Sequence, residues 1–402
     1  MSESNKAVFA ICGTRLFDGE AFHDHEAERK AVVVADGVIR DIAAMENLDP
    51  AIVKIDGREH LLAPGFVDLQ VNGGGGALLN DQPSPEVVRK IAASHRAFGT
   101  TAMLPTVITD DLATVKSAVA AVRAARQQGI APSVLGVHVE GIYIDAPKRG
   151  AHPAEFIRPV INDAQVAAEI AWLKAADCGD VMLTVSPHKI SPAVIADLVK
   201  AGIVVSLGHS EASYAEAVAA LAAGARGFTH LYNAMSPLTH RQPGMVGAAL
   251  EDRDSFCGII ADGHHVEPPA LKIAIAAKPR GKVVLVTDAM PTAAGGPSHF
   301  NLLGRRVDLK DDRLELPDGT LAGSNLTMDE AVRFAIDRLD VEIGEALRMA
   351  SLYPAGFIRR DHEFGRIVPG YRASLVLLDK ALRVRSTWVD GVADRRLLPS
   401  KA

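Results

Sequence analysis

The chain has 402 residues, of which 43 are Lys or Arg and 49 are Asp or Glu, so its formal net charge is −6. This balance gives the protein no overall attraction to nucleic acid or to anionic membranes. No apolar run approaches the ~18 residues of a membrane-spanning helix. The three cysteines provide no disulfide framework and no Cys-x-x-Cys pair, so we expect a cytoplasmic protein. Any metal site must therefore be built from carboxylates and from the 14 histidines.

Both ends of the chain have the pattern of short β-strands. Near the start, Asp36-Gly37 is typical of a hairpin turn and separates two β-branched runs. Near the end, residues 374–379 (SLVLLD) have the composition of a buried strand, and the turn signal Asp390-Gly391 follows soon after.

Between these ends, short apolar segments alternate with amphipathic helices, which is the pattern of βα units around a parallel sheet. Helices are expected to begin near Ser84, Asn162 and Ser213, each a residue type that caps helix N-termini. Eight such strands favour a (β/α)₈ TIM-type barrel, with an open doubly wound sheet as the alternative. The expected strands are residues 63–70, 101–107, 133–140, 181–186, 203–209, 227–230, 256–261 and 283–288.

Four of these predicted strands end in a titratable side chain, namely Glu140, His209, His230 and Asp288. In a TIM-type barrel the chemistry gathers at the carboxyl ends of the strands, so we expect these four to lie together. One Glu and two His suit Zn²⁺ or Fe²⁺ and leave positions open for water. A nearby Asp can then serve as general base to that water.

The first predicted barrel strand ends in Gln70 and Asn72, where many barrel hydrolases carry His-x-His to hold a second metal. Neutral amides are poor metal ligands. This favours one divalent metal ion per subunit, held by Glu140, His209 and His230. Gln70 and Asn72 have two interpretations at this point: they orient substrate or water, or they are ordinary loop polarity.

Taken together, these motifs resemble the N-acetylglucosamine-6-phosphate deacetylase family of the amidohydrolase superfamily. The resemblance implies an α/β fold, in which a (β/α)₈ barrel over residues 62–365 carries a small β-sandwich-like domain. Both chain termini would form that domain, from residues 1–61 together with 366–402. The matching segments run in family order and are APGFVDLQVNGGGG (63–76), GVHVEGIYIDAPKRGAH (136–152), LGHSEASY (207–214), THLYNAMSPLTHRQPG (229–244), ADGHHVE (261–267), LVTDAM (285–290) and LAGSNLTM (321–328).

The resemblance also implies roles for individual residues. Glu140, His209 and His230 match metal ligands, Asp288 matches the catalytic acid/base, and His152 matches a catalytic histidine beside the reacting amide. The residues matched to substrate contacts are Gln70, Asn72, Gly141, His152, Asn233, Ala234, Arg241, His265, Leu321, Ala322 and Gly323.

The implied reaction is the metal-dependent hydrolysis of N-acetyl-D-glucosamine 6-phosphate to D-glucosamine 6-phosphate and acetate. Asp288 would take a proton from water and pass it to the departing amine, and His152 would donate to the developing oxyanion. Arg241 offers a planar fork suited to phosphate. A homodimer is expected, with His265 reaching the neighbouring active site.

Three alternatives stay open on the sequence alone. The galactosamine epimer differs from the glucosamine substrate only in the orientation of one hydroxyl. A cyclic-amide amidohydrolase is disfavoured by the missing His-x-His motif. A barrel that kept the fold and lost the reaction is opposed by the intact set of Glu140, His209, His230 and Asp288.

Overall fold

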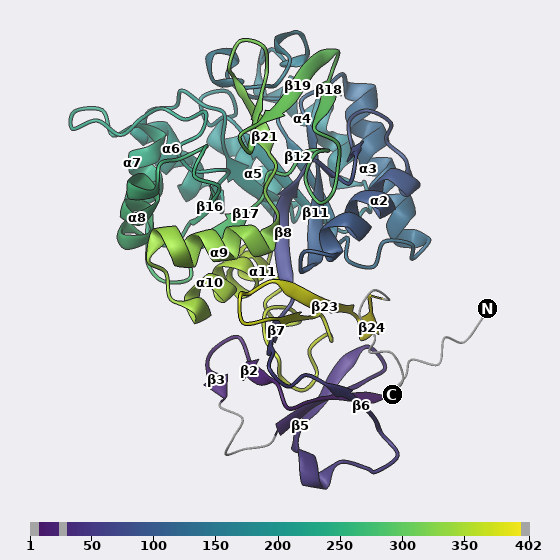
Figure 1. Cartoon of the computed structure of the whole chain (residues 1–402). Coiled ribbons are helices and arrows are strands. Elements are labelled where there is room, and N and C mark those ends of the chain that lie inside the picture. Colours follow the sequence, from purple (N-terminus) through teal and green to yellow (C-terminus); the bar gives the residue numbers. More distant parts are fainter. Residues whose placement is uncertain (1–7, 24–29, 395–402) are drawn as a thin grey trace.

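A computed structural model describes residues 8–23 and 30–394 and contains the expected barrel (Figure 1). Its parallel sheet has eight strands, and each strand pairs with its neighbour in the sequence. A parallel bridge between Val71 and Ala289 joins the first strand to the last, and the Asp288 N–H donates to the Gln70 carbonyl at 2.9 Å. This closure excludes the open doubly wound sheet. The strands are β8 (Phe66–Val71), β11 (Thr100–Ile108), β12 (Gly136–Glu140), β13 (Asp180–Val185), β14 (Val204–Leu207), β15 (Gly227–Phe228), β16 (Phe256–Ile260) and β17 (Val283–Val286).

The three predicted helix starts are confirmed. The side chains of Ser84, Asn162 and Ser213 each accept a hydrogen bond from a backbone N–H of the first turn, and Ser213 forms a full capping box with Glu216. Within the described ranges, no helix combines the length and apolar composition needed to cross a bilayer. The helices are α2 (Pro85–Arg96), α3 (Leu112–Gln127), α4 (Asp163–Lys174), α5 (Pro192–Lys200), α6 (Tyr214–Ala222), α7 (Gly244–Glu251), α8 (Pro268–Ala277), α9 (Met328–Leu339), α10 (Ile343–Ala350) and α11 (Leu352–Phe357), with short 3₁₀ turns at Met45–Asn47, Ala146–Lys148 and Ala154–Phe156.

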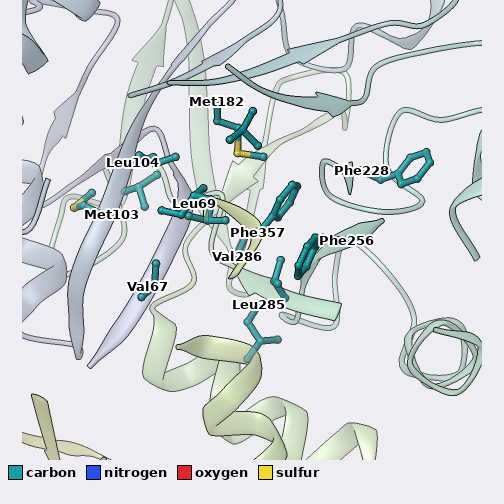
Figure 2. Packing of buried hydrophobic residues seen from close by; sticks show 14 of the residues in the cluster. Val67, Leu69, Met103, Leu104, Met182, Phe228, Phe256, Leu285, Val286 and Phe357 are labelled. Carbon is teal, nitrogen blue, oxygen red and sulfur yellow. The ribbon is translucent and has the colours of Figure 1, made fainter. Parts of the chain in front are cut away.

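Apolar side chains fill the barrel and the space between its strands and helices (Figure 2). Strands buried on both faces are expected to be almost continuously apolar, and all nine residues of β11 are buried. Phe357 of α11 stacks on Phe256 at the start of β16, with ring centroids 4.9 Å apart. Helix α11 therefore covers the amino-terminal end of the barrel, and the polar site lies at the opposite end.

Strands from both ends of the chain build two further sheets below the barrel (Figure 1). The predicted hairpin turn is confirmed, because Asp36 (φ 55°) and Gly37 (φ 81°) both adopt the left-handed conformation that such turns require. The four-stranded sheet has the order β5 (Val38–Ala44), β4 (Lys30–Ala35), β1 (Phe9–Cys12) and β6 (Val53–Asp56). The six-stranded sheet has the order β24 (Val392–Ala393), β23 (Val384–Val389), β22 (Leu375–Leu378), β7 (Leu61–Pro64), β2 (Arg15–Phe17) and β3 (Phe22–His23).

One strand boundary differs from the prediction. We expected the first barrel strand to begin at residue 63, but β7 pairs antiparallel with β22, and the barrel strand β8 begins only at Phe66. Residues 61–71 are buried almost throughout, so an apolar run gives no sign of the point at which the chain passes from one sheet to the next.

An antiparallel sheet between β17 and α9 was not predicted. Its apolar face packs against Ile108, Ala151 and Met290 at the carboxyl end of the barrel, where Figure 1 shows it above the barrel strands. Its strands are short, and two of them, β19 and β20, consist mostly of charged residues, so no apolar run in the sequence stands out. They are β18 (His299–Leu302), β19 (Arg305–Lys310), β20 (Arg313–Glu315) and β21 (Leu321–Ser324); a two-stranded hairpin, β9 (Gly73–Gly74) with β10 (Ala77–Leu78), lies after β8.

Candidate active site

The side chains predicted from the strand ends meet at the carboxyl end of the barrel. Glu140 ends β12, and His209 and His230 follow β14 and β15 by two residues each. The Oε1 atom of Glu140 lies 3.1 Å from Nε2 of His209 and 2.9 Å from Nε2 of His230, and the two Nε2 atoms are 3.0 Å apart. All three side chains are buried. The carboxylate oxygen and the two imidazole nitrogens therefore converge on one point.

This donor set fits a single divalent cation. Nδ1 of His209 lies 2.8 Å from the carbonyl of Lys148, which can only accept, so Nδ1 carries the hydrogen and Nε2 keeps its lone pair for a metal. One atom each from Glu140, His209 and His230 lies within 4.8 Å of the others. One carboxylate and two imidazoles suit first-row metals such as Zn²⁺ and Fe²⁺ and do not distinguish between them.

The backbone at these strand ends is strained. His209 (φ 49°), His230 (φ 35°) and Asp288 (φ 53°) all have positive φ, which residues other than glycine rarely adopt. Each such residue costs on the order of 1–3 kcal/mol, and residues of this kind cluster at functional sites. The hydrogen bonds and packing around the barrel mouth must offset that cost.

Asp288 is held by the two amides at the end of the first barrel strand. Asn72 Nδ2 donates to Asp288 Oδ1 at 2.6 Å, and Gln70 Nε2 donates both to Asp288 Oδ1 and to Glu140 Oε2, each at 3.1 Å. No described side chain donates to Oδ2, which leaves that oxygen for another partner. Burial, followed by the charge of Glu140, raises the pKa of Asp288 to about 6. Gln70 and Asn72 are therefore not ordinary polar loop residues, because both hold the carboxylate of Asp288 in place.

A cavity of about 280 Å³ opens beside these groups. Ile108, Ile260 and Met290 form apolar parts of its wall and were not predicted. Ile108 and Ile260 are the last residues of β11 and β16, so attention to every strand end was the signal that could have found them. The predicted residues that line the cavity are Asn72, Glu140, His152, His209, His230, Asn233, Ala234, His265, Asp288, Leu321 and Gly323.

Four predicted substrate contacts do not line this cavity. Gln70 lies behind Asp288 and Glu140, and Gly141 follows Glu140 directly. Ala322 is fully buried in the apolar cluster under the antiparallel sheet. Arg241 is exposed on the loop between β15 and α7, and this chain by itself does not bring its guanidinium to the cavity.

His265 lines the cavity of its own chain, and its Nδ1 lies 2.6 Å from Asp262 Oδ2. Both side chains are less than one-tenth exposed. The expectation that His265 reaches a neighbouring active site stays a prediction.

Beneath the site, Asp68 is a fully buried carboxyl two residues before Gln70. Its Oδ2 accepts a hydrogen bond from Thr287 Oγ1 at 2.6 Å. Burial raises the pKa of Asp68 from 3.8 to about 7, so the native state binds the proton more tightly than the unfolded state. This tighter proton binding stabilises the folded state. The stabilisation is fully present below about pH 4 and is lost as the pH rises through about 7.

Asp68→Asn is therefore expected to flatten the pH dependence of stability. Because asparagine is neutral at every pH, we expect the Tm of the variant to change less than that of the wild type between about pH 4 and about pH 8. Calorimetry across this range measures the effect, and Asp308→Asn on the exposed face of β19 is the control. If the Tm of the Asp68 variant depended on pH as strongly as that of the wild type, the raised pKa of Asp68 would be contradicted.

Comparison with known proteins agrees with the geometry. An N-acetylgalactosamine-6-phosphate deacetylase of a Shewanella species is 40% identical to this chain and covers 90% of it and 91% of its own length. An N-acetylglucosamine-6-phosphate deacetylase of Haemophilus influenzae is 36% identical and covers 90% and 93%. The crystal structure of the N-acetylglucosamine-6-phosphate deacetylase from Pasteurella multocida superposes with a TM-score of 0.90 at 33% identity, over 96% of this chain and 99% of that one. Residues 61–393 match the amidohydrolase family, and the chain belongs to that family.

Proposed function

We propose that this protein removes the acetyl group from N-acetyl-D-glucosamine 6-phosphate and releases D-glucosamine 6-phosphate and acetate. The observation that carries the proposal is the convergence of Glu140, His209 and His230 beside Asp288 in one cavity. The relatives from Haemophilus influenzae and Pasteurella multocida, both named for this reaction, support it. The galactosamine epimer is the competing substrate, because the Shewanella relative is named for it.

In this proposal, Glu140, His209 and His230 hold one divalent metal ion, Zn²⁺ or Fe²⁺. When bound, the ion would lower the pKa of a water molecule towards about 7 and polarise the amide carbonyl. Asp288 uses its unengaged Oδ2 to take the proton of the attacking water, and it later returns a proton to the departing amine. The amine cannot leave without that proton, because an amide anion is a very poor leaving group.

The remaining cavity residues would bind the sugar and its phosphate. Asn233, the backbone N–H of Ala234 and the imidazole of His265 are the polar groups available on one side, and the stretch Leu321–Gly323 lies on the antiparallel sheet. Because Arg241 is exposed, its proposed phosphate contact requires a second subunit or a movement of its loop. We retain the homodimer as part of this proposal.

The division into domains is likewise proposed. The small β domain would comprise residues 1–61 with 366–402, of which 1–7, 24–29 and 395–402 lie outside the described residues, and the barrel would comprise 62–365. A cytoplasmic location fits the three cysteines, all of which are buried free thiols.

A kinetic panel tests the substrate. We expect kcat/KM for N-acetyl-D-glucosamine 6-phosphate to exceed that for unphosphorylated N-acetyl-D-glucosamine by at least about 10- to 100-fold. This factor is the value of one charge-assisted hydrogen bond to phosphate. Acetate release from both epimers, each with and without phosphate, is the measurement. A higher kcat/KM on the galactosamine epimer would replace the proposed substrate. Equal kcat/KM with and without phosphate would contradict a phosphate-binding site.

Arg241→Ala separates the phosphate contact from the chemistry in the same panel. The variant is expected to raise KM for the phosphorylated sugar and to leave KM for the unphosphorylated sugar unchanged, since only the phosphate lies within reach of the proposed contact. An equal rise in both values would mean that Arg241 has been assigned to the wrong group. Arg253→Ala, at another exposed arginine, is the control.

A further inference from the structure

Only one of the two ring nitrogens of His152, Nδ1, has hydrogen-bond partners among the described residues. His152 is buried in the loop after β12, and its ring centroid lies 4.4 Å from that of His209. Its Nδ1 atom lies 2.9 Å from the hydroxyl of Thr109 and 3.4 Å from the backbone N–H of the same residue. Among the described residues, Nε2 has no hydrogen-bond partner, and His152 lines the cavity.

The backbone N–H of Thr109, rather than its hydroxyl, determines which nitrogen of His152 carries the hydrogen, because the hydroxyl can either donate or accept and also lies 3.5 Å from the Glu140 carbonyl. A backbone N–H can only donate, and among the described residues the N–H of Thr109 has no acceptor other than Nδ1 of His152. A hydrogen on Nδ1 would set two donors against each other and leave the buried N–H of Thr109 without an acceptor, which costs about 1–3 kcal/mol. Nδ1 must therefore present a lone pair.

Gly141 makes this contact possible. Its φ of +101° is a conformation that favours glycine, and a Cβ atom built on it would lie 2.0 Å from Thr109 Oγ1 and 3.7 Å from His152 Nδ1. Any side chain at position 141 would therefore push the Thr109 hydroxyl out of its place. Gly141, whose match to a substrate contact stays a prediction, provides the space in which Thr109 reaches His152.

We propose that Thr109 is a positioning residue that holds His152 in the neutral form with its hydrogen on Nε2 and directs that N–H into the cavity. In this state His152 is a hydrogen-bond donor and does not act as a base. Under the proposed function, on which this inference rests, the donor faces the amide carbonyl as negative charge develops on its oxygen. Asp288 then remains the group that transfers protons.

Two variants test the positioning role. Thr109→Val removes the hydroxyl at nearly constant volume and is expected to lower kcat by about 10- to 100-fold, as for other groups that orient a functional ring from behind. KM and metal content are expected to stay unchanged. Thr109→Ser keeps the hydroxyl and is expected to remain within about threefold of the wild type. A Thr109→Val variant with wild-type kcat would overturn the proposal.

A spectroscopic measurement tests the tautomer without reference to activity. In metal-free protein labelled with ¹⁵N-histidine, the ring signals of His152, assigned by their loss in His152→Gln, are expected to show a hydrogen on Nε2 in the wild type. Because Thr109→Val keeps the backbone N–H, we expect the variant to keep the hydrogen on Nε2 and to lose only the fixed orientation of the ring. A hydrogen on Nδ1 in the wild type would overturn the inference even if the valine variant failed to fold.

The two proposals can fail separately. A wild-type protein that releases no acetate from any of the four sugars contradicts the proposed function, and the ring spectrum still decides the state of His152. A fully active wild type whose His152 carries its hydrogen on Nδ1 contradicts only the inference about Thr109.

Discussion

Asp288→Asn is expected to lower kcat by about 10²- to 10⁴-fold, the usual contribution of a general acid–base group. The amide of asparagine cannot take a proton from water or return one to the amine. Its oxygen can still accept from Asn72 and Gln70 at the position of Oδ1, so the packing of the site is retained. Steady-state kinetics with metal analysis on the same sample measures the effect.

The metal content is the internal control of this experiment, because Asp288 is not one of the three clustered ligands. We expect the Asp288→Asn variant to bind as much metal as the wild type and to keep its KM within a few-fold. Asp252→Asn, the same substitution near the opposite end of the barrel, should leave kcat unchanged. An Asp288→Asn variant that retained metal and wild-type kcat would show that another group carries the proton.

Removal of the metal is expected to abolish the activity and to lower the Tm, and addition of one equivalent of Zn²⁺ or Fe²⁺ is expected to restore both. A ligand that binds only the folded state stabilises it by about 4 kcal/mol at ~1,000 times its Kd. Calorimetry and acetate release, each before and after chelation, provide independent readouts.

A histidine variant locates this metal site on the cluster. His230→Ala removes one of three ligands and is expected to reduce the metal content from about one per chain to less than about a tenth, consistent with the loss of a first-row metal ligand. His188→Ala is the matched control, since His188 is half exposed and bonded to Glu216 away from the cluster. Equal loss of metal in both variants, or in neither, would contradict the assignment of the site.

The sequence by itself determined the barrel and the members of its metal cluster. Strand and helix periodicities are local, and the carboxyl ends of parallel strands meet at one end of a barrel whatever the loops do. Glu140, His209, His230 and Asp288 could therefore be grouped before any contact between them was known. The helix caps at Ser84, Asn162 and Ser213 were predictable for the same reason, because a cap involves only its own first turn.

Only the tertiary structure decided the contacts that depend on loop paths. Thr109 and His152 are 43 residues apart, and neither residue signals the other in the sequence. The antiparallel sheet over the site was not predicted, because its short strands are stabilised by packing against the barrel and not by a pattern in their own sequence. Arg241 has the chemistry of a phosphate ligand, yet in its own chain it is exposed and does not line the cavity. Residue type indicates which chemistry is possible, whereas the course of the backbone between distant residues determines which groups meet.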